Sequence, residues 1–91
     1  MSLNAVWHLY LLECVDGSLY TGITTDVARR YEAHANGKGA RYTRSHPPNR
    51  LLASVAIGSR SEALRAELEL KARPRGEKLA AIQSMARPIE E

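Results

Sequence analysis

A β-hairpin near the start of the chain limits the possible folds more than any other feature. Residues 6–14 (VWHLYLLEC) are rich in apolar and aromatic side chains, and the turn-forming pair Asp16-Gly17 follows closely. The strand pattern resumes at residues 19–21 (LYT). Strands joined by so short a turn pair antiparallel, so the chain is expected to begin with part of a small sheet.

The remaining elements are predicted by their capping residues and apolar spacing. Asp26 is placed to cap a helix that Asn36-Gly37 ends, and Ser59 or Ser61 opens a second one. The predicted elements are a helix over residues 27–34, a strand over 51–58, and helices over 62–72 and 77–86. This ββαβαα order predicts an α+β fold in which helices cover the sheet.

The segment between the first helix and the third strand is expected to lack regular structure. Residues 37–50 (GKGARYTRSHPPNR) hold two glycines and two prolines, which interrupt helices and strands. Apolar residues then recur on one side of the strand: Leu51, Ala53, Val55 and Ile57. In the last helix they recur at helical spacing: Leu79, Ile82 and Met85.

Length, charge and cysteine content narrow the class of protein. The 91 residues are expected to form one domain, with a core over about 6–86 and an acidic C-terminal tail. No segment holds the ~20 apolar residues of a membrane span, so no membrane partner is expected. The single cysteine, Cys14, excludes an internal disulfide and a cysteine-based zinc site, and a cytoplasmic location is the expectation.

The positive charge is concentrated in one region. The net charge is +3, and residues 29–50 hold six Lys and Arg side chains against one acid, Glu32. Tyr31 and Tyr42 lie among them, a composition that suits a polyanionic partner because phosphates attract cations and aromatic rings stack on bases. A solvated loop has the same composition, so both interpretations stand.

Two predicted helices carry charged groups toward the core. Arg30 and His34 share one helix face, either as part of a site or as an arginine that reaches solvent and a histidine bonded to backbone. On the second helix Glu67 falls on the side of Leu68 and borders the buried face. A carboxylate there is costly unless it binds a metal or pairs with a cation, for which Lys71 is the candidate.

The hairpin turn decides whether Tyr10 and Tyr20 face the same side of the sheet. A two-residue turn places them on opposite faces, whereas a three-residue loop or a bulge brings them to one face. The residues alone leave this open.

Together these residues resemble the GIY-YIG nuclease superfamily, and most closely its small stand-alone bacterial members. The resemblance covers about residues 6–85 and rests on HLY, YTG, a following Arg and His, and ALRAE: Tyr10, Tyr20, Gly22, Arg30, His34 and Glu67. It implies a three-stranded antiparallel sheet flanked by helices. Because both tyrosines line the active site in that superfamily, it also implies a bulge or odd-length loop in the hairpin.

The resemblance further implies an endonuclease that cuts DNA phosphodiester bonds with one divalent metal ion. In that scheme Glu67 holds Mg²⁺ or Mn²⁺, with water and phosphate oxygens completing the coordination. Tyr20 orients the attacking water or accepts its proton, and Arg30 assists it and clamps the phosphate. His34 would take the proton onward, and Tyr10 would bond the phosphate or the water network.

A domain this small implies weak, salt-sensitive binding and a preference for nucleic-acid structure over base sequence. The residues expected to bind nucleic acid are Lys38, Arg41, Tyr42 and Arg44. A homodimer or a protein partner would raise the affinity, and RNA stays an alternative to DNA because phosphate contacts do not separate them. DNA repair is the expected setting, since incision nucleases of excision repair belong to the superfamily.

Two other hypotheses remain: a nucleic-acid-binding module with this fold but little or no catalysis, and an interaction domain in which Glu67 only pairs with Lys71 or Arg30. Ile23 stands where some repair nucleases carry lysine, and no asparagine follows Asn49 where others have one, which favours the binding module. The Tyr, Arg and Glu set favours the nuclease.

Overall fold

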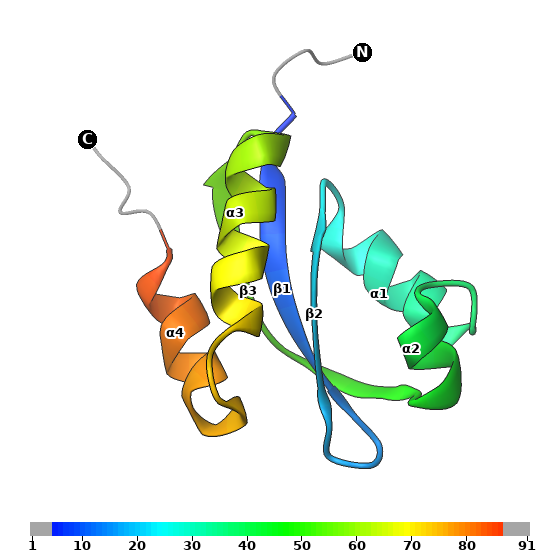
Figure 1. The fold of residues 1–91 in the computed structure, drawn as a ribbon. Helices are drawn as coiled ribbons and strands as arrows, with labels where there is room; N and C mark the ends of the chain where they lie inside the picture. Colours follow the sequence, from blue (N-terminus) through cyan, green and yellow to red (C-terminus); the bar gives the residue numbers. More distant parts are fainter. Residues whose placement is uncertain (1–4, 87–91) are drawn as a thin grey trace.

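The structure is a computed structural model that describes residues 5–86, and the acidic C-terminal tail expected beyond them lies outside the described residues. Figure 1 shows the chain as an α+β fold. The elements are β1 (Trp7–Cys14), β2 (Leu19–Thr24), α1 (Val27–Ala35), α2 (Arg41–Ser45), β3 (Pro48–Gly58), α3 (Arg60–Lys71), the 3-10 turn η1 (Arg75–Glu77) and α4 (Lys78–Ser84). The predicted three-stranded antiparallel sheet with flanking helices is confirmed.

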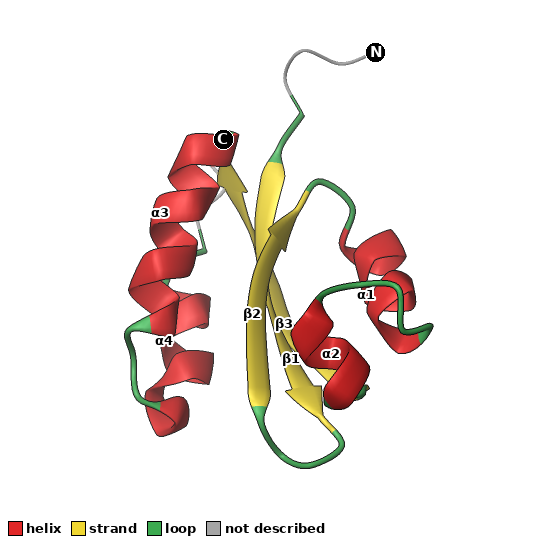
Figure 2. Cartoon of the chain, turned by 45° about the vertical axis from the view of Figure 1, so that its right-hand side comes forward, coloured by secondary structure: helices red, strands yellow, loops and turns green. Residues whose placement is uncertain are grey.

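The sheet has the order β2-β1-β3, so β1 pairs with both other strands and runs through the centre. Helices α3 and α4 cover one face, and α1 and α2 lie on the other (Figure 2). Because both faces are covered, four successive residues of β1, Leu9 to Leu12, are buried. None of the helices in the described part combines the length and apolar composition needed to cross a membrane.

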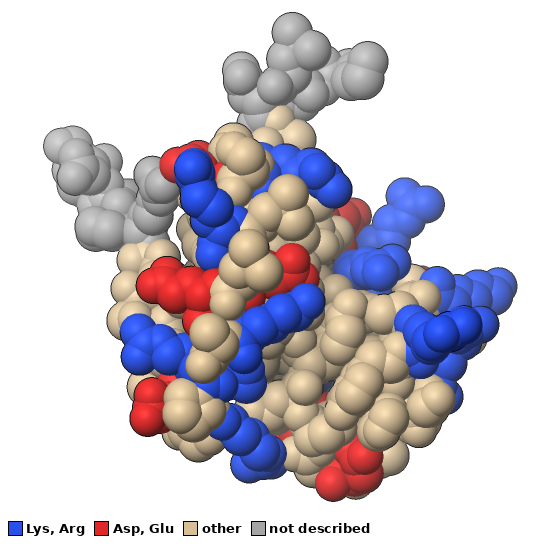
Figure 3. Space-filling view, in the orientation of Figure 1, with Lys and Arg blue, Asp and Glu red and all other residues tan. Residues whose placement is uncertain are grey.

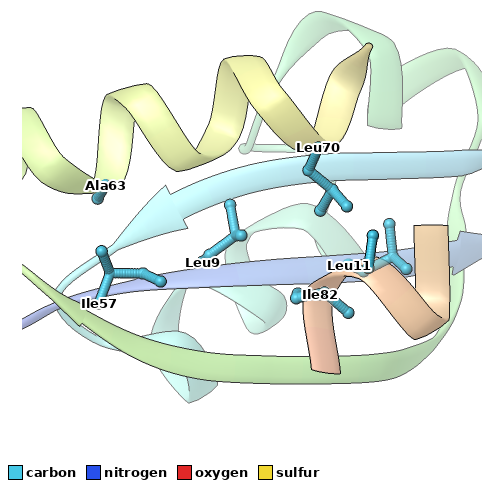
Figure 4. Packing of buried hydrophobic residues seen from close by; sticks show 7 residues of the cluster. Leu9, Leu11, Ile57, Ala63, Leu70 and Ile82 are labelled. Atoms are coloured by element: carbon cyan, nitrogen blue, oxygen red, sulfur yellow. The ribbon is translucent and has the colours of Figure 1, made fainter. Parts of the chain in front are cut away.

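The hydrophobic core fills the space between the sheet and the helices α3 and α4 (Figure 4). Leu9 and Leu11 of β1 point to this side, because alternate residues of a strand share a face. The core cluster consists of Leu9, Leu11, Ile57, Ala63, Leu70, Ala81 and Ile82. Tyr10 lies between these leucines in sequence, so it projects to the opposite face, toward α1.

The hairpin between β1 and β2 contains an odd-length loop, as the resemblance implied. Cys14 N–H donates to Ser18 O at 2.8 Å, leaving Val15, Asp16 and Gly17 as the loop, and Gly17 adopts a φ of 85°, which glycine tolerates without strain. In this register Tyr10 pairs with Gly22 and Leu12 with Tyr20. Directly paired residues share a face, so Tyr10 and Tyr20 lie on the same side of the sheet.

The prediction that residues 37–50 lack regular structure is wrong in its second half. Residues Arg41–Ser45 form the short helix α2, and β3 begins at Pro48, three residues earlier than predicted. A five-residue helix is too short to be stable by itself. It forms here because Thr43 is buried against α1.

Three apolar residues predicted to face the core are exposed. The pairing of β1 with β3 shifts between Leu11, opposite Ala53, and Leu12, opposite Leu51, so one extra residue turns Leu51 away. Leu52 packs against the core in its place. The other two exposed residues are Leu68 of α3 and Leu79 of α4.

Candidate active site

The two hairpin tyrosines and the α1 histidine form one aromatic cluster. The Tyr10 and His34 ring centroids are 5.8 Å apart, Tyr20 and His34 are 5.1 Å apart edge-to-face, and Tyr10 and Tyr20 are 6.3 Å apart. The odd-length loop brings the tyrosines to one face, and α1 carries His34 to the same face. Tyr10 is 2% exposed, whereas Tyr20 is partly accessible at the edge strand.

His34 is held by side chains on both of its ring nitrogens. Its Nε2 lies 2.8 Å from the Tyr10 hydroxyl oxygen, and its Nδ1 lies 2.7 Å from Thr43 Oγ1. The ring is 1% exposed. His34 is therefore part of a buried side-chain network, and the backbone N–H of Ala40 also contacts its Nδ1 at 3.4 Å, the kind of backbone bond that the sequence left open.

Burial shifts the pKa values of Tyr10 and His34 in opposite directions, and each shift favours the neutral form of the side chain. Desolvation, reinforced by the nearby charge of Arg30, lowers the pKa of His34 to about 4. Desolvation also raises the pKa of Tyr10 to about 12, although a hydrogen bond from the Arg30 side chain acts in the opposite direction. At neutral pH the network consists of a neutral imidazole and an un-ionised phenol.

Gly22 lets the Tyr10 ring reach the outer edge of the sheet. A Cβ atom added at position 22 would overlap the Tyr10 hydroxyl and ring. Gly22 is also the residue directly opposite Tyr10 in the β1–β2 pairing. The glycine of the YTG sequence thus serves the close approach of a side chain to the backbone, and its φ is not one that requires glycine.

Arg30 joins this network to an open cavity on the surface. The arginine is partly buried and acts on the pKa values of both Tyr10 and His34. The cavity, of about 410 Å³, is lined by Arg30, Arg29, Thr24, Thr25, Asp26 and Ala33. A guanidinium placed between a buried hydroxyl and an open cavity can bind an anion that enters from solvent.

Glu67 belongs to α3, which lies on the other side of the sheet from α1 (Figures 1 and 2). Its side chain is 17% exposed, and its negative charge contributes to the raised pKa of Tyr10. Lys71 Nζ lies 3.4 Å from Glu67 Oε2, so the cation that the sequence proposed is present. Among the described residues no group of three His, Cys, Asp or Glu side chains could form a metal cage.

The four residues expected to bind nucleic acid do not form one uniform surface. Lys38, Arg41 and Arg44 are exposed, and Figure 3 shows Lys and Arg side chains gathered on the α1 side of the molecule while α3 carries both charges. Tyr42 instead packs on the aromatic cluster: its ring stacks on Tyr20 at 5.9 Å and on His46 at 4.0 Å. Its ring faces are thus engaged with protein side chains.

Two residues of this site were not identified from the sequence. Thr43 is 1% exposed and bonded to His34, and His46 stacks on Tyr42 while its Nε2 lies 3.8 Å from Asp16 Oδ2 in the hairpin loop. Both lie in or next to α2, in the segment expected to be a loop. The stretch GKGARYTR contains Thr43 and ends just before His46, but its charges favour binding to nucleic acid over a structural role.

Comparison with known proteins gives matches over most of the chain. Residues 6–79 match the GIY-YIG catalytic domain. A UPF0213 protein of Cupriavidus pinatubonensis is 54% identical over 88 residues, 97% of this chain and 98% of that protein. A UPF0213 protein of Xanthomonas axonopodis pv. citri is 53% identical over 85 residues, 93% of this chain and 83% of that protein.

Two solution NMR structures are also similar. The UPF0213 protein BH0048 from Bacillus halodurans has 48% sequence identity and a TM-score of 0.53, covering 91% of this chain and 88% of its own. The protein EF2693 from E. faecalis has 32% identity and a TM-score of 0.63, covering 94% of both chains.

Proposed function

This chain belongs to the GIY-YIG catalytic domain family, a nuclease-type family, and we propose that it is a divalent-metal-dependent endonuclease acting on DNA phosphodiester bonds. One observation carries the proposal. The partly accessible Tyr20 and Arg30 lie beside a buried Tyr10–His34 pair, and the charge of Glu67 acts on Tyr10 from α3, on the other face of the sheet. Tyr10, Tyr20 and His34, which are distant in sequence, are thus brought together on one face of the sheet.

Burial assigns different roles to the site residues. Tyr10 and His34 are 2% and 1% exposed and bonded to one another, so neither is free to meet a substrate. We therefore propose that Tyr10 and His34 support the neighbouring site residues, in place of the phosphate contact and proton transfer that the resemblance implied. Tyr20 is the tyrosine that would orient the attacking water or accept its proton. Arg30 would bind the scissile phosphate, because its planar guanidinium matches two phosphate oxygens.

Glu67 is suited to bind a magnesium or manganese ion, provided that the substrate and water complete the coordination shell of the ion. Among the described residues the Glu67 side chain forms an ion pair with Lys71 and no hydrogen bond, and a hard carboxylate oxygen is the ligand that Mg²⁺ prefers. A single carboxylate is not a full cage, so water and phosphate oxygens would supply the other ligands. When bound, the ion would neutralise charge developing on the phosphate and the leaving oxygen.

The ion pair of Glu67 with Lys71 supports the second candidate function, a nucleic-acid-binding module without catalysis. A lysine 3.4 Å from the carboxylate neutralises it without a metal. Lys71 is half exposed, however, so the pair is weak and a metal ion could displace it. Ile23 stands where some repair nucleases carry lysine. It packs against the hydrophobic core, so this chain has no cation at that position.

The substrate that we propose is DNA of a particular structure, such as a single strand, a flap or a branched end. The exposed arginines and lysine contact phosphates, which carry no base sequence. The same contacts serve RNA, and a second copy of the chain or a protein partner would add affinity. A cytoplasmic setting is part of the proposal, with Cys14 remaining a buried free thiol.

Cleavage assays test this function directly. Labelled single-stranded, duplex, flap and branched DNA, each also made as RNA, are incubated with the protein in Mg²⁺, in Mn²⁺ and in EDTA. We expect cutting of at least one DNA structure with either metal and none in EDTA. Binding of the same panel without cutting in any metal would establish the binding module instead.

Removing the exposed cations should weaken binding without changing which structure is preferred. Lys38→Ala, Arg41→Ala and Arg44→Ala each remove one phosphate contact, so each should lower the slope of log affinity against log salt by about 1. Fluorescence anisotropy across a salt series measures this slope. Arg73→Ala, which removes an exposed arginine beside Glu77 beyond the end of α3, is the matched control. A wild-type salt slope in all three variants would show that this surface does not bind nucleic acid.

A further inference from the structure

The buried hydroxyl of Thr43 ends a chain of polar side chains that starts at Arg30. Thr43 Oγ1 lies 2.7 Å from His34 Nδ1 and 3.0 Å from the carbonyl oxygen of Ala40, to which it donates. His34 Nε2 lies 2.8 Å from the Tyr10 hydroxyl, which the Arg30 side chain also reaches. These contacts connect the short helix α2 to the arginine that faces the cavity.

The direction of each hydrogen bond follows from the number of protons available. A threonine hydroxyl has one proton, and Thr43 gives it to Ala40 O, so Oγ1 accepts from Nδ1–H of His34. The backbone N–H of Ala40 also donates to Nδ1 at 3.4 Å, a bond that the Nδ1–H tautomer would lose, but the 2.7 Å contact to Thr43 is much the shorter of the two. The Thr43 end of the chain therefore favours the Nδ1–H tautomer.

The other end of the chain is compatible with the same tautomer. An arginine side chain only donates hydrogen bonds, so the Tyr10 oxygen accepts from Arg30 and its own proton must go elsewhere. Tyr10 is 2% exposed, and among the described residues His34 Nε2 is the acceptor within reach. An unprotonated Nε2 in a neutral imidazole requires the proton to be on Nδ1.

We propose that Thr43 is a positioning residue, which holds His34 as the Nδ1–H tautomer so that Tyr10 presents its oxygen lone pairs to Arg30. In the opposite tautomer Nε2–H would point at Tyr10, and the Tyr10 proton would be left facing the guanidinium. Arg30 would then lose the contact that fixes it for phosphate binding. The effect on cleavage rests on the proposed nuclease function, whereas the tautomer assignment does not.

Two further features support this role. A Cβ atom at Gly39 would overlap the His34 ring, so the backbone leading into α2 lies directly against the imidazole and holds Thr43 in place. Burial also lowers the pKa of His34 to about 4, so the ring stays neutral at physiological pH and exists as one tautomer or the other.

The first measurement is the tautomer of His34 by NMR of ¹⁵N-labelled protein at neutral pH. We expect Nδ1 to resonate as a protonated, pyrrole-type nitrogen and Nε2 as an unprotonated, pyridine-type nitrogen. In Thr43→Val, which keeps the shape and removes the hydroxyl, the Nε2–H tautomer should become populated. Thr43→Ser should restore the native spectrum, and Ser45→Ala, on the exposed side of the same helix, should not change it.

Cleavage kinetics provide the second measurement. Thr43→Val should lower kcat by about 10- to 100-fold, because misplacing a positioned group costs on this scale, with a much smaller change in KM. Thr43→Ser should recover most of the loss. Wild-type protein with Nε2–H, or Thr43→Val with an unchanged tautomer, overturns the proposal. If Thr43→Val fails to fold, the wild-type spectrum decides alone, and it also decides if no nuclease activity is found.

Discussion

Replacing Glu67 by glutamine should abolish metal-dependent cleavage, with kcat falling by about 10³-fold. The amide keeps the shape of the side chain but has no negative charge to hold a divalent cation. Loss of several kcal/mol of charge stabilisation in the transition state corresponds to two to three orders of magnitude in rate. Single-turnover cleavage of the preferred DNA structure, with Mg²⁺ varied from limiting to saturating, measures the effect and shows whether added metal rescues the variant.

The matched control is Glu69→Gln, which removes an exposed carboxylate from the same helix and should leave cleavage unchanged. Lys71→Met adds a second comparison, because it frees Glu67 from its ion pair. Glu67 should then bind the metal ion more tightly, and cleavage should saturate at a lower Mg²⁺ concentration. Because the Glu67–Lys71 pair is partly exposed, Glu67→Gln and Lys71→Met should each change the free energy of unfolding by at most about 1 kcal/mol. Full activity in Glu67→Gln would contradict the metal role and leave Glu67 as the partner of Lys71.

Sequence reasoning succeeded where a local pattern decides the structure. The Asp26 cap accepts from Arg29 N–H at 3.1 Å, and the Ser59 cap forms a reciprocal pair of bonds with Glu62. Such signals depend on residues three positions apart, so they are visible in the sequence. The hairpin loop was harder, because Asp16-Gly17 fits either a two- or a three-residue loop. Its odd length came from the family resemblance.

The errors arose where contacts between residues distant in sequence determine the structure. Helix α2 has five residues and exists because Thr43 packs under His34, a contact between residues nine positions apart. The exposed Leu51 results from a register shift against β1, which no alternation within β3 reveals. Leu68 is 69% exposed although it neighbours the largely buried Glu67, because the inner face of α3 is set by Ala63 and Leu70.

The residues of the candidate site likewise divide into those that local sequence can predict and those that it cannot. Arg30, His34 and Glu67 were found because charged groups at the border of a buried helix face need an explanation. The supporting role that we propose for Tyr10 and His34 was not predictable, since it follows from their burial and from the bond between them. Thr43 carries no charge and lies in a basic stretch of sequence, so nothing in its local sequence separates it from a solvated threonine.

Acidification should destabilise the folded protein through His34. In the unfolded chain the histidine has a pKa near 6.5, whereas in the fold burial and the charge of Arg30 lower it to about 4. Between these values the unfolded state binds a proton that the folded state does not, so the free energy of unfolding falls as the pH falls. A difference of about 2.5 units corresponds to about 3 kcal/mol in total, a large fraction of the stability of a small domain.

Urea denaturation at about pH 7 and about pH 4.5 measures this loss, and two histidine variants identify its origin. His34→Gln should be less stable at neutral pH because it disrupts the bonds to Tyr10 and Thr43, but it should lose less stability on acidification than wild type. His46→Gln, at a histidine that is only partly buried, should keep the wild-type dependence. Equal losses in wild type and His34→Gln would place the acid sensitivity in the carboxylates. The buried imidazole would then be free to titrate in the fold, and the Tyr10–His34 bond would be weaker than its 2.8 Å length indicates.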